Sequence, residues 1–256
     1  MADWSPSAYL RFADERARPA SDLLAQIPLK APQLVYDLGC GPGNSTALLE
    51  RAYPTAEIIG IDNSPAMLAT ARQDLPQRRF IEADLKTWVP GTSADLLYSN
   101  ATFQWVPHHE AVLLRLLKHL SSGAVLAVQM PDNLDEPSHV LMRQTAGDGP
   151  WADKLREASG ARTRLGAPRD YHELLKPHCT RLDIWHTAYN HVLEGAQGIV
   201  DLVSSTGLRP FLNLLDAAER KAFVENYRMR LASAYPALND GRVMLSFPRL
   251  FIVAQA

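Results

Sequence analysis

The chain has 256 residues, of which 46% are apolar and 21% are charged, a balance that excludes a disordered, collagen-like or coiled-coil protein. Its 26 basic and 28 acidic side chains give a formal net charge of -2, which argues against nucleic acid or an anionic membrane as the main partner. Two cysteines, no signal-peptide pattern and no apolar run long enough to span a bilayer predict a protein of the reducing cytoplasm.

Helical patterns alternate with short apolar runs through the first half of the chain. A helix-like segment at residues 9–27 comes first, and strands are predicted at residues 34–38, 57–62, 79–84, 95–100 and 124–130. Asn44 can cap a helix that ends before Pro54, and Asn63 or Ser64 can cap a second helix with Pro65 in its first turn. A leucine-rich helix is expected at residues 108–120. Continuous apolar strands that alternate with helices predict an α/β fold with a doubly wound, mostly parallel sheet.

The second half of the chain is less regular. A long strand is predicted at residues 182–193 and a terminal strand at residues 250–254. Between them, apolar side chains recur at helical spacing from Ile199 to Tyr235. This pattern predicts a helical insert at one end of the sheet, which either covers a cleft or serves only for packing.

The most informative motif lies where the first strand turns into the first helix after it, and it reads D-L-G-C-G-P-G-N from Asp37 to Asn44. Glycine lets backbone N–H groups approach a ligand at the positively polarised helix N-terminus. The motif departs from the dinucleotide pattern G-x-G-x-x-G, because Asn44 stands at the third glycine position and Pro42 lacks an N–H. The Asp37 carboxylate would repel a pyrophosphate, so the motif favours a ligand with a cationic group.

Acidic residues also end the next two predicted strands. Asp62 closes the second strand, where a carboxylate can accept hydrogen bonds from both hydroxyls of a ribose. Asp84 closes the third strand, next to Leu85, where it can accept a hydrogen bond from an adenine amino group. Three acids along one sheet edge, beside a glycine turn, suit a ligand with a cationic amino acid end and an adenosine end. This combination indicates S-adenosylmethionine.

The run from Asp37 to Asn44, followed by Asp62 and Asp84, resembles the class I S-adenosylmethionine-dependent methyltransferases. A closer similarity, to the trans-aconitate methyltransferases, extends over nearly the whole chain. It is carried by residues 4–24, 99–107 (S-N-A-T-F-Q-W-V-P), 129–138 (Q-M-P-D-N-L-D-E-P-S), 206–212 and 241–254. The resemblance implies a Rossmann-like fold with these cofactor contacts: Asp37, Gly39, Gly41, Gly43, Asp62, Asn63, Met67, Asp84, Leu85, Asn100, Gln104 and Trp105. We expect a small-molecule substrate, a monomer, and neither nucleic acid nor membrane as a partner.

The resemblance also suggests how the chain is organised. We expect a single methyltransferase domain over residues 1–256, with a cofactor-binding half at residues 31–135 and a helical insert on the substrate side at residues 195–240. Residues 1–30 are expected to form a helical cover. This segment carries Trp4 and Tyr9 beside several arginines, and we predict that it closes over the bound cofactor and excludes water.

Other candidates for catalytic chemistry are weaker. Asp132 and Asn133 follow the fifth predicted strand, as in metal-dependent catechol methyltransferases, but Asn100 stands where those enzymes have another acid, so no metal is expected. His108 and His109 could act as a general base, although histidines at a helix start are more often structural. The remaining histidines show no metal-ligand spacing.

We therefore expect an O-methyltransferase that esterifies a carboxylate of a small polycarboxylic acid. By resemblance, the substrate is trans-aconitate and the product is its monomethyl ester. A carboxylic acid is already ionised at neutral pH, so no general base is required. Two alternatives remain open: a methyltransferase that acts on a phenol, an amine or carbon, and a non-catalytic nucleoside-binding module that regulates a partner.

A polycarboxylate needs cationic partners, and 20 of the 26 basic residues are arginines, whose planar guanidinium can bind a carboxylate through two hydrogen bonds. We expect the helical insert and its flanks to supply them, because this part lies outside the minimal sheet. Arg209, next to Pro210 and between two helical stretches, is the first candidate, followed by Arg228 and Arg242, with Tyr171 as a neutral donor.

Overall fold

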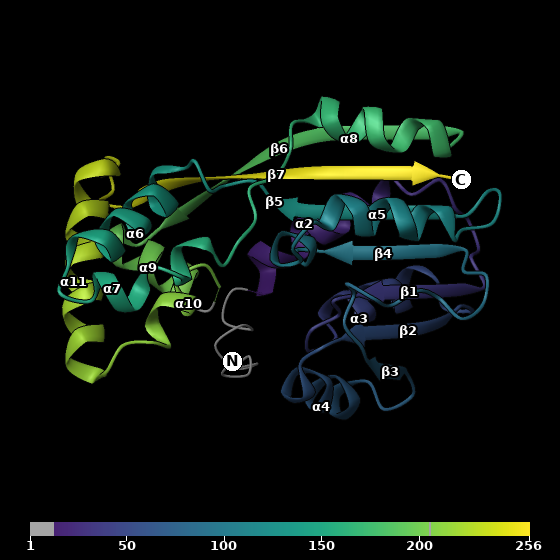
Figure 1. The fold of residues 1–256 in the computed structure, drawn as a ribbon, viewed down its shortest axis with the longest axis horizontal. Helices are drawn as coiled ribbons and strands as arrows, with labels where there is room; N and C mark the ends of the chain where they lie inside the picture. Colours follow the sequence, from purple (N-terminus) through teal and green to yellow (C-terminus); the bar gives the residue numbers. More distant parts are fainter. Residues whose placement is uncertain (1–12, 205) are drawn as a thin grey trace.

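The fold is built on one seven-stranded sheet with the strand order β3-β2-β1-β4-β5-β7-β6 (Figure 1). The computed structural model describes residues 13–204 and 206–256. The strands are β1 (Leu34–Leu38), β2 (Glu57–Asp62), β3 (Arg79–Glu82), β4 (Leu96–Asn100), β5 (Val125–Pro131), β6 (Arg181–Leu193) and β7 (Val243–Gln255). All neighbouring strands are parallel except that β7 runs antiparallel to β5 and β6. The predicted doubly wound, mostly parallel sheet is confirmed.

Helices cover both faces of the sheet, because its central strands bury apolar side chains on both faces. Val35 and Tyr98 face the layer that contains α2 and α3, whereas Tyr36 and Leu97 face α5 and α8. The covering helices are α2 (Ala13–Ala25), α3 (Asn44–Ala52), α4 (Pro65–Asp74), α5 (His109–Lys118) and α8 (Pro168–Leu175). This alternation explains why the strands have continuous apolar runs rather than an alternating pattern.

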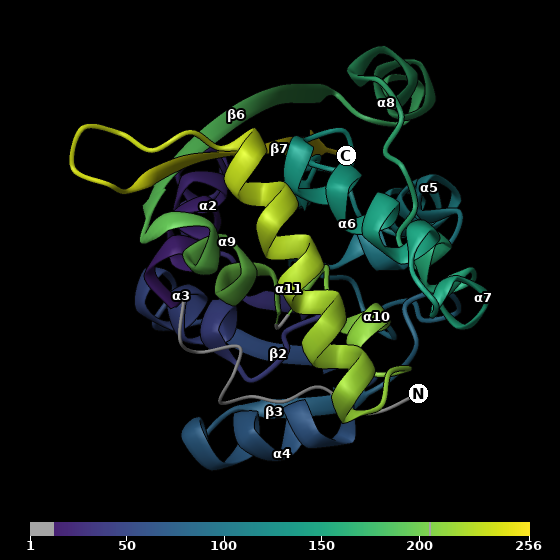
Figure 2. The ribbon, with the colours of Figure 1, turned by 90° about the vertical axis from the view of Figure 1, so that its left-hand side faces the viewer.

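A separate group of helices, which we call the helical cap, lies beyond the carboxyl ends of β4 and β5 (Figure 1). Its members are α6 (Pro137–Asp148), α7 (Ala152–Leu155), α9 (Gly195–Ser204), α10 (Arg209–Leu212) and α11 (Ala217–Ala234). Figure 2 views the molecule from this end and shows α11 running across the face of the cap. Ile199, Phe223 and Leu231 belong to a core of its own. The predicted insert between the last two strands is confirmed as α9 to α11, whereas the sequence analysis did not predict α6 and α7.

The two longest strands join the cap to the sheet. β6 and β7 have 13 residues each. β5 pairs with β7 only between Arg249 and Gln255, whereas β6 stays paired with β7 as far as Leu193 and Val243. The outer part of this pair therefore forms a two-stranded arm, and Leu193, Val243 and Leu245 pack into the core of the cap.

The described part of the N-terminal segment, α2, packs as a member of a covering layer. Ala20 is buried against the sheet, and the Tyr98 hydroxyl donates to its carbonyl at 2.8 Å. The Tyr189 hydroxyl donates to the Asp22 carboxylate at 2.6 Å. Residues 1–12, which carry the aromatic side chains behind the predicted cover, lie outside the described residues. Closure of this segment over the cofactor therefore stays a prediction.

Several predicted boundaries differ from those of the structure by a few residues. β3 ends at Glu82 because the chain turns at Asp84, whose carbonyl accepts hydrogen bonds from the N–H groups of Thr87 and Trp88. β7 begins at Val243, well before the predicted start, because its first half pairs only with β6. None of the described helices has both the length and the apolar composition that a membrane crossing requires.

Candidate active site

The glycine turn between β1 and α3 has a left-handed backbone at three positions. Gly39, Gly41 and Gly43 have φ values of 72°, 54° and 96°. A Cβ atom on Gly39 would lie 2.1 Å from Oγ1 of Thr102, so the turn packs directly against the chain that follows β4. Gly43 is the N-cap of α3, not Asn44 as predicted, and no side chain caps this end of the helix.

Asp62, at the end of β2, is held beside this turn by two backbone amides. The Gly41 N–H donates to its Oδ2 and the Ser64 N–H donates to its Oδ1, both at 2.9 Å. No atom of the described residues lies within 4 Å of where a Cβ atom on Gly41 would stand, so within that part of the chain this side of the turn is open. Ser64 rather than Asn63 caps α4, by accepting a 3.3 Å hydrogen bond from the N–H of the buried Met67. The structure thus brings Asp62, Gly41 and the start of α4 together.

Asp37 is fully buried in β1, just before the glycine turn. Its Oδ2 accepts hydrogen bonds of 2.7 Å from both Ser45 Oγ and Thr46 Oγ1, and its Oδ1 has no partner among the described residues. Burial raises the pKa of Asp37 from 3.8 to about 6, and the two hydroxyls partly oppose this rise. The carboxylate therefore fixes the start of α3 on β1. When ionised, it leaves a buried negative charge near the turn that favours a cationic ligand.

Asp84 and Leu85 lie in the turn after β3. Asp84 Oδ1 accepts a 2.9 Å hydrogen bond from the Lys86 N–H, and its Oδ2 lies 3.4 Å from Lys86 Nζ. Leu85 is buried, and its carbonyl accepts a hydrogen bond from Arg115 at 2.9 Å. Asp84, which was predicted to contact the adenine, therefore lies in an exposed turn and not at a strand end. The adenine contact itself remains a prediction.

The chain after β4 joins the glycine turn to a second set of polar side chains. Thr102 Oγ1 donates to the Gly39 carbonyl at 3.2 Å, and Gln104 Nε2 donates to the Ala101 carbonyl at 2.6 Å. The side-chain oxygens of Asn100 and Gln104 are buried without a hydrogen-bond partner in the described chain. Because a buried polar atom without a partner is unfavourable, these oxygens mark a place where a bound donor would be stabilised.

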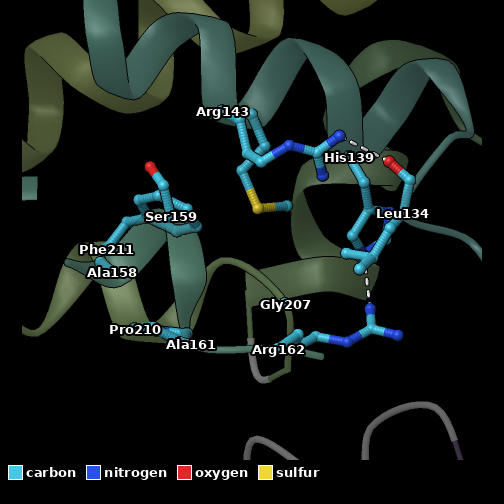
Figure 3. A pocket seen from close by; sticks show the side chains of 11 residues that line it. Leu134, His139, Arg143, Ala158, Ser159, Ala161, Arg162, Gly207, Pro210 and Phe211 are labelled. Atoms are coloured by element: carbon cyan, nitrogen blue, oxygen red, sulfur yellow. Dashed lines mark hydrogen bonds between the residues drawn. The ribbon is translucent and has the colours of Figure 1, made fainter. Parts of the chain in front are cut away.

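A pocket lies among the helices of the cap and the segments that join them (Figure 3). Its wall includes side chains of α6, of the segment that follows α7 and of α10, and Figure 3 shows Arg143 above His139 and Arg162 below it. The lining residues are Leu134, His139, Met142, Arg143, Ala158, Ser159, Ala161, Arg162, Gly207, Pro210 and Phe211. The pocket therefore combines apolar walls with cationic and imidazole groups.

Arg162 has the most contacts among the polar side chains of the pocket. Its Nη1 donates to Asn133 Oδ1 at 2.9 Å and to His139 Nε2 at 3.2 Å, and its Nη2 donates to the Pro131 carbonyl at 3.0 Å. The guanidinium carbon lies 5.6 Å from the centre of the Trp105 ring. Because an arginine can only donate, His139 Nε2 is the acceptor and the imidazole carries its proton on Nδ1. Arg162 was not predicted as a site residue, because an arginine in an irregular segment carries no spacing signal.

The arginines predicted to bind the substrate lie in different surroundings. Arg209 begins α10 and directly precedes a proline that lines the pocket. Arg228 forms an ion pair with Glu225 on α11, and Arg242 forms one with Asp240. Neither Arg228 nor Arg242 lines the pocket. Of these three arginines, the structure brings only Arg209 next to it.

Tyr171 lies on α8, in another part of the fold, and its side chain is only 1% exposed in the core that α5 and α8 share. Its hydroxyl oxygen is 2.7 Å from Nε2 of His109, which is fully buried. The expectation that Tyr171 donates to a substrate is corrected by this placement, because its hydroxyl is enclosed in the core. Burial lowers the pKa of His109, which serves packing there and cannot reach a substrate as a base. His108 is the exposed N-cap of α5, with φ of 53°.

The possible metal ligands considered in the sequence have other partners. Asp132 Oδ2 accepts a 2.9 Å hydrogen bond from His186 Nε2, and Asn133 accepts one from Arg162. Within residues 13–204 and 206–256, no group of three or more histidine, cysteine, aspartate or glutamate side chains could hold a metal ion.

The residues along this edge fit S-adenosylmethionine in their chemistry. The Asp62 carboxylate can accept from hydroxyl groups, the open side of Gly41 leaves room for a ligand beside it, and buried Asp37 contributes negative charge near a cationic end. A sheet of this strand order, with a glycine turn after β1 and an acid at the end of β2, defines the class I S-adenosylmethionine-dependent methyltransferases.

Comparisons with known proteins place the chain within this class. The methyltransferase domain family matches residues 35–123. The chain is 56% identical over 254 residues to the trans-aconitate 2-methyltransferase of Rhodopseudomonas palustris strain HaA2, covering 99% of both chains. It is 52% identical over 256 residues to the enzyme of that name from Yersinia pestis strain Pestoides F, covering 100% of this chain and 99% of the relative. The chain belongs to the trans-aconitate 2-methyltransferase family.

Solved structures show the same fold at low sequence identity. The YcgJ protein of Bacillus subtilis is 12% identical with a TM-score of 0.60, covering 93% of this chain and 98% of that chain. Phosphoethanolamine N-methyltransferase 2 of Haemonchus contortus, solved in complex with S-adenosyl-L-methionine, is 14% identical with a TM-score of 0.54, covering 93% of this chain and 52% of that chain.

Proposed function

We propose that this protein transfers the methyl group of S-adenosylmethionine to a carboxylate of trans-aconitate, giving the monomethyl ester and S-adenosylhomocysteine. The observation that carries the proposal is the 52% to 56% identity to trans-aconitate 2-methyltransferases over the whole chain. The aligned region includes the helical cap as well as the sheet, so the similarity covers the part of the fold that we propose binds the substrate. The basic pocket in the helical cap supports it, because guanidinium groups bind carboxylates well.

This reaction requires no general base from the protein. A carboxylic acid with an ordinary pKa near 4 is ionised at neutral pH, so a nucleophilic oxygen is present without proton transfer. When bound, S-adenosylmethionine supplies an activated methyl group on a sulfonium that leaves as a neutral thioether. The task of the protein is to align the carboxylate with that group and to exclude water, and alignment can contribute roughly 7–11 kcal/mol. His109 is fully buried and is not accessible as a base, which agrees with a reaction that needs none.

The proposal assigns roles to the residues at the sheet edge. Asp62 accepts hydrogen bonds from the ribose hydroxyls, and Asp84 accepts one from the adenine amino group. The turn around Gly41 lies against the amino acid end of the cofactor, and Arg209 binds a carboxylate of the substrate at the cap.

Methyl transfer from labelled S-adenosylmethionine to a panel of acceptors tests the proposed function. The panel contains trans-aconitate, cis-aconitate, citrate, a catechol and a primary amine, and products are identified by mass spectrometry. Label should appear in trans-aconitate and be released by mild alkali, because a methyl ester is hydrolysed whereas a methyl ether or methylamine is not. Transfer only to the catechol or the amine would overturn the proposal in favour of another methyltransferase. Tight S-adenosylhomocysteine binding without transfer to any acceptor would indicate a binding module.

The proposal includes a monomer in the cytoplasm. Cys40 is buried and Cys179 is unpaired, which suits a reducing compartment. Size-exclusion chromatography with light scattering should give a mass near 28.4 kDa, and a mass near twice this value would contradict the monomer.

A further inference from the structure

The pocket at the cap holds two arginine side chains that have no acidic partner among the described residues. Arg162 donates to neutral acceptors there, and Arg143 donates to the Leu134 carbonyl at 2.7 Å. Within the described residues, neither guanidinium forms an ion pair. Arg164, two residues beyond Arg162, shows the contrast, because it is paired with Asp135 through two hydrogen bonds. The pocket therefore concentrates positive charge that the described chain does not neutralise by direct contact.

This charge acts on the titratable groups of the pocket. Burial lowers the pKa of Arg162 to about 10. The Asp132 carboxylate raises this pKa, whereas the neighbouring Arg143 cation lowers it further. Burial, Arg162 and Arg143 hold the pKa of His139 well below its usual range, so its imidazole is neutral at pH 7. The Asp132 carboxylate is hydrogen-bonded to His186 and not to Arg162. A buried cation without an anion in contact is unfavourable, and a bound carboxylate would compensate it.

Two buried donors in the same cluster also lack acceptors. Arg162 Nε and Asn133 Nδ2 have no hydrogen-bond partner in residues 13–204 and 206–256, although the two side chains are bonded to each other through Nη1 and Oδ1. A carboxylate offers two oxygens that can accept from such donors. The cluster also reaches the chain after β4, since Trp105 lies beside the guanidinium and the Thr163 N–H donates to the Gln104 carbonyl at 3.2 Å. It therefore adjoins the residues predicted to lie near the methyl donor.

We propose that Arg162 and Arg143, with His139 holding the Arg162 guanidinium in place, form a subsite that binds one carboxylate of the substrate and selects acids with more than one carboxylate. The inference deepens the proposed function and rests on it. The carboxylate held here is one that does not react. Methyl transfer removes the charge of the reacting carboxylate, so a guanidinium bonded to that group would stabilise the ground state more than the transition state and slow the reaction.

Steady-state kinetics with Arg162→Gln and Arg162→Lys test this subsite. KM for trans-aconitate should rise ten-fold or more in Arg162→Gln with little change in kcat, because the lost contact is made equally in the ground and transition states. Arg162→Lys keeps the charge but not the planar fork, and it should recover part of the loss. The matched control is Arg164→Gln, whose side chain is exposed and paired with Asp135, and its kinetics should equal those of the wild type. S-adenosylhomocysteine affinity, measured by calorimetry, should be the same in all four proteins.

Substrate discrimination separates this role from a structural one. Itaconate and trans-glutaconate each lack one carboxylate of trans-aconitate, and the wild type should prefer trans-aconitate to at least one of them. In Arg162→Gln this preference should fall ten-fold or more, which a general loss of folding would not produce. If Arg162→Gln does not fold, Arg143→Gln, which breaks only the hydrogen bond to Leu134, should reduce the same preference at least three-fold.

Two results would overturn the proposals separately. A wild type that methylates trans-aconitate, with variants of Arg162 and Arg143 that keep its KM and its preference, refutes the subsite alone. A wild type that methylates no acid refutes the proposed function, and the subsite with it.

Discussion

Replacement of Asp37 by asparagine should change how the stability of the protein depends on pH. Burial raises the pKa of Asp37 from 3.8 to about 6, so the folded protein holds this proton more tightly than the unfolded chain does. Between these two values the folded state binds more protons than the unfolded state, and stability therefore falls as the pH rises. Since one pKa unit corresponds to about 1.4 kcal/mol, the ionised carboxylate destabilises the fold by about 3 kcal/mol at neutral pH.

About half of this effect falls between pH 5 and pH 8. Asp37→Asn keeps an oxygen that can accept from Ser45 and Thr46 and removes the titration. In urea unfolding, its free energy of unfolding relative to the wild type should be about 1.5 kcal/mol more favourable at pH 8 than at pH 5. Glu57→Gln, at the exposed start of β2, serves as the control. If the stability difference between Asp37→Asn and the wild type is the same at both pH values, the carboxylate is not ionised against a burial penalty and the reasoning fails.

Three further predictions concern the other predicted site residues. Asp62→Ala should weaken S-adenosylhomocysteine binding ten-fold or more in calorimetry, because a charge-assisted hydrogen bond contributes about 1.5–3 kcal/mol. Asp84→Asn should weaken this binding less. Unchanged affinity in Asp62→Ala would contradict the ribose contact. Gly41→Ala should fold with a loss of about 1 kcal/mol from its left-handed backbone. It should bind the cofactor weakly, because its Cβ atom would enter the open space proposed for the ligand. Gly39→Ala should lose much more stability, because its Cβ atom would clash with the chain after β4. Equal thermal stability of these two variants would count against this difference. Tyr171→Phe should lose about 1–3 kcal/mol of stability by leaving a buried imidazole without its partner, with unchanged kcat/KM for trans-aconitate. A fall in turnover at unchanged stability would return Tyr171 to the substrate site.

The strands and the glycine turn could be predicted because their signals are local. The run from Leu34 to Leu38 is apolar and ends at a glycine, and Pro65 after Ser64 is a sequence signal for a helix start that the structure bears out. Asp62 was placed at a strand end for the same reason. The end of β3 at Glu82 was harder to predict, because the turn that stops it depends on backbone hydrogen bonds to the Asp84 carbonyl.

The pocket could not be predicted in this way. Asn133, His139 and Arg162 come from three separate segments, and their spacing in the chain follows no helix or strand period. Only the folded cap brings them together. Arg228 and Arg242 came after Arg209 as candidates in the sequence, and the structure pairs both of them with neighbouring acids.

The two-stranded arm of β6 and β7 has a consequence for the exchange of parts between relatives. Leu193 and Val243 are paired at its tip, so residues 194–242 connect two adjacent positions of the arm. A tight turn could replace this connection without breaking a strand pair. Residues 132–180 likewise link β5 to β6 outside the strands. Because the pocket takes its wall from both segments, a chimera that carries over only one of them would combine two mismatched halves of the proposed substrate subsite. Substrate preference should therefore move between relatives only when both segments are transplanted together.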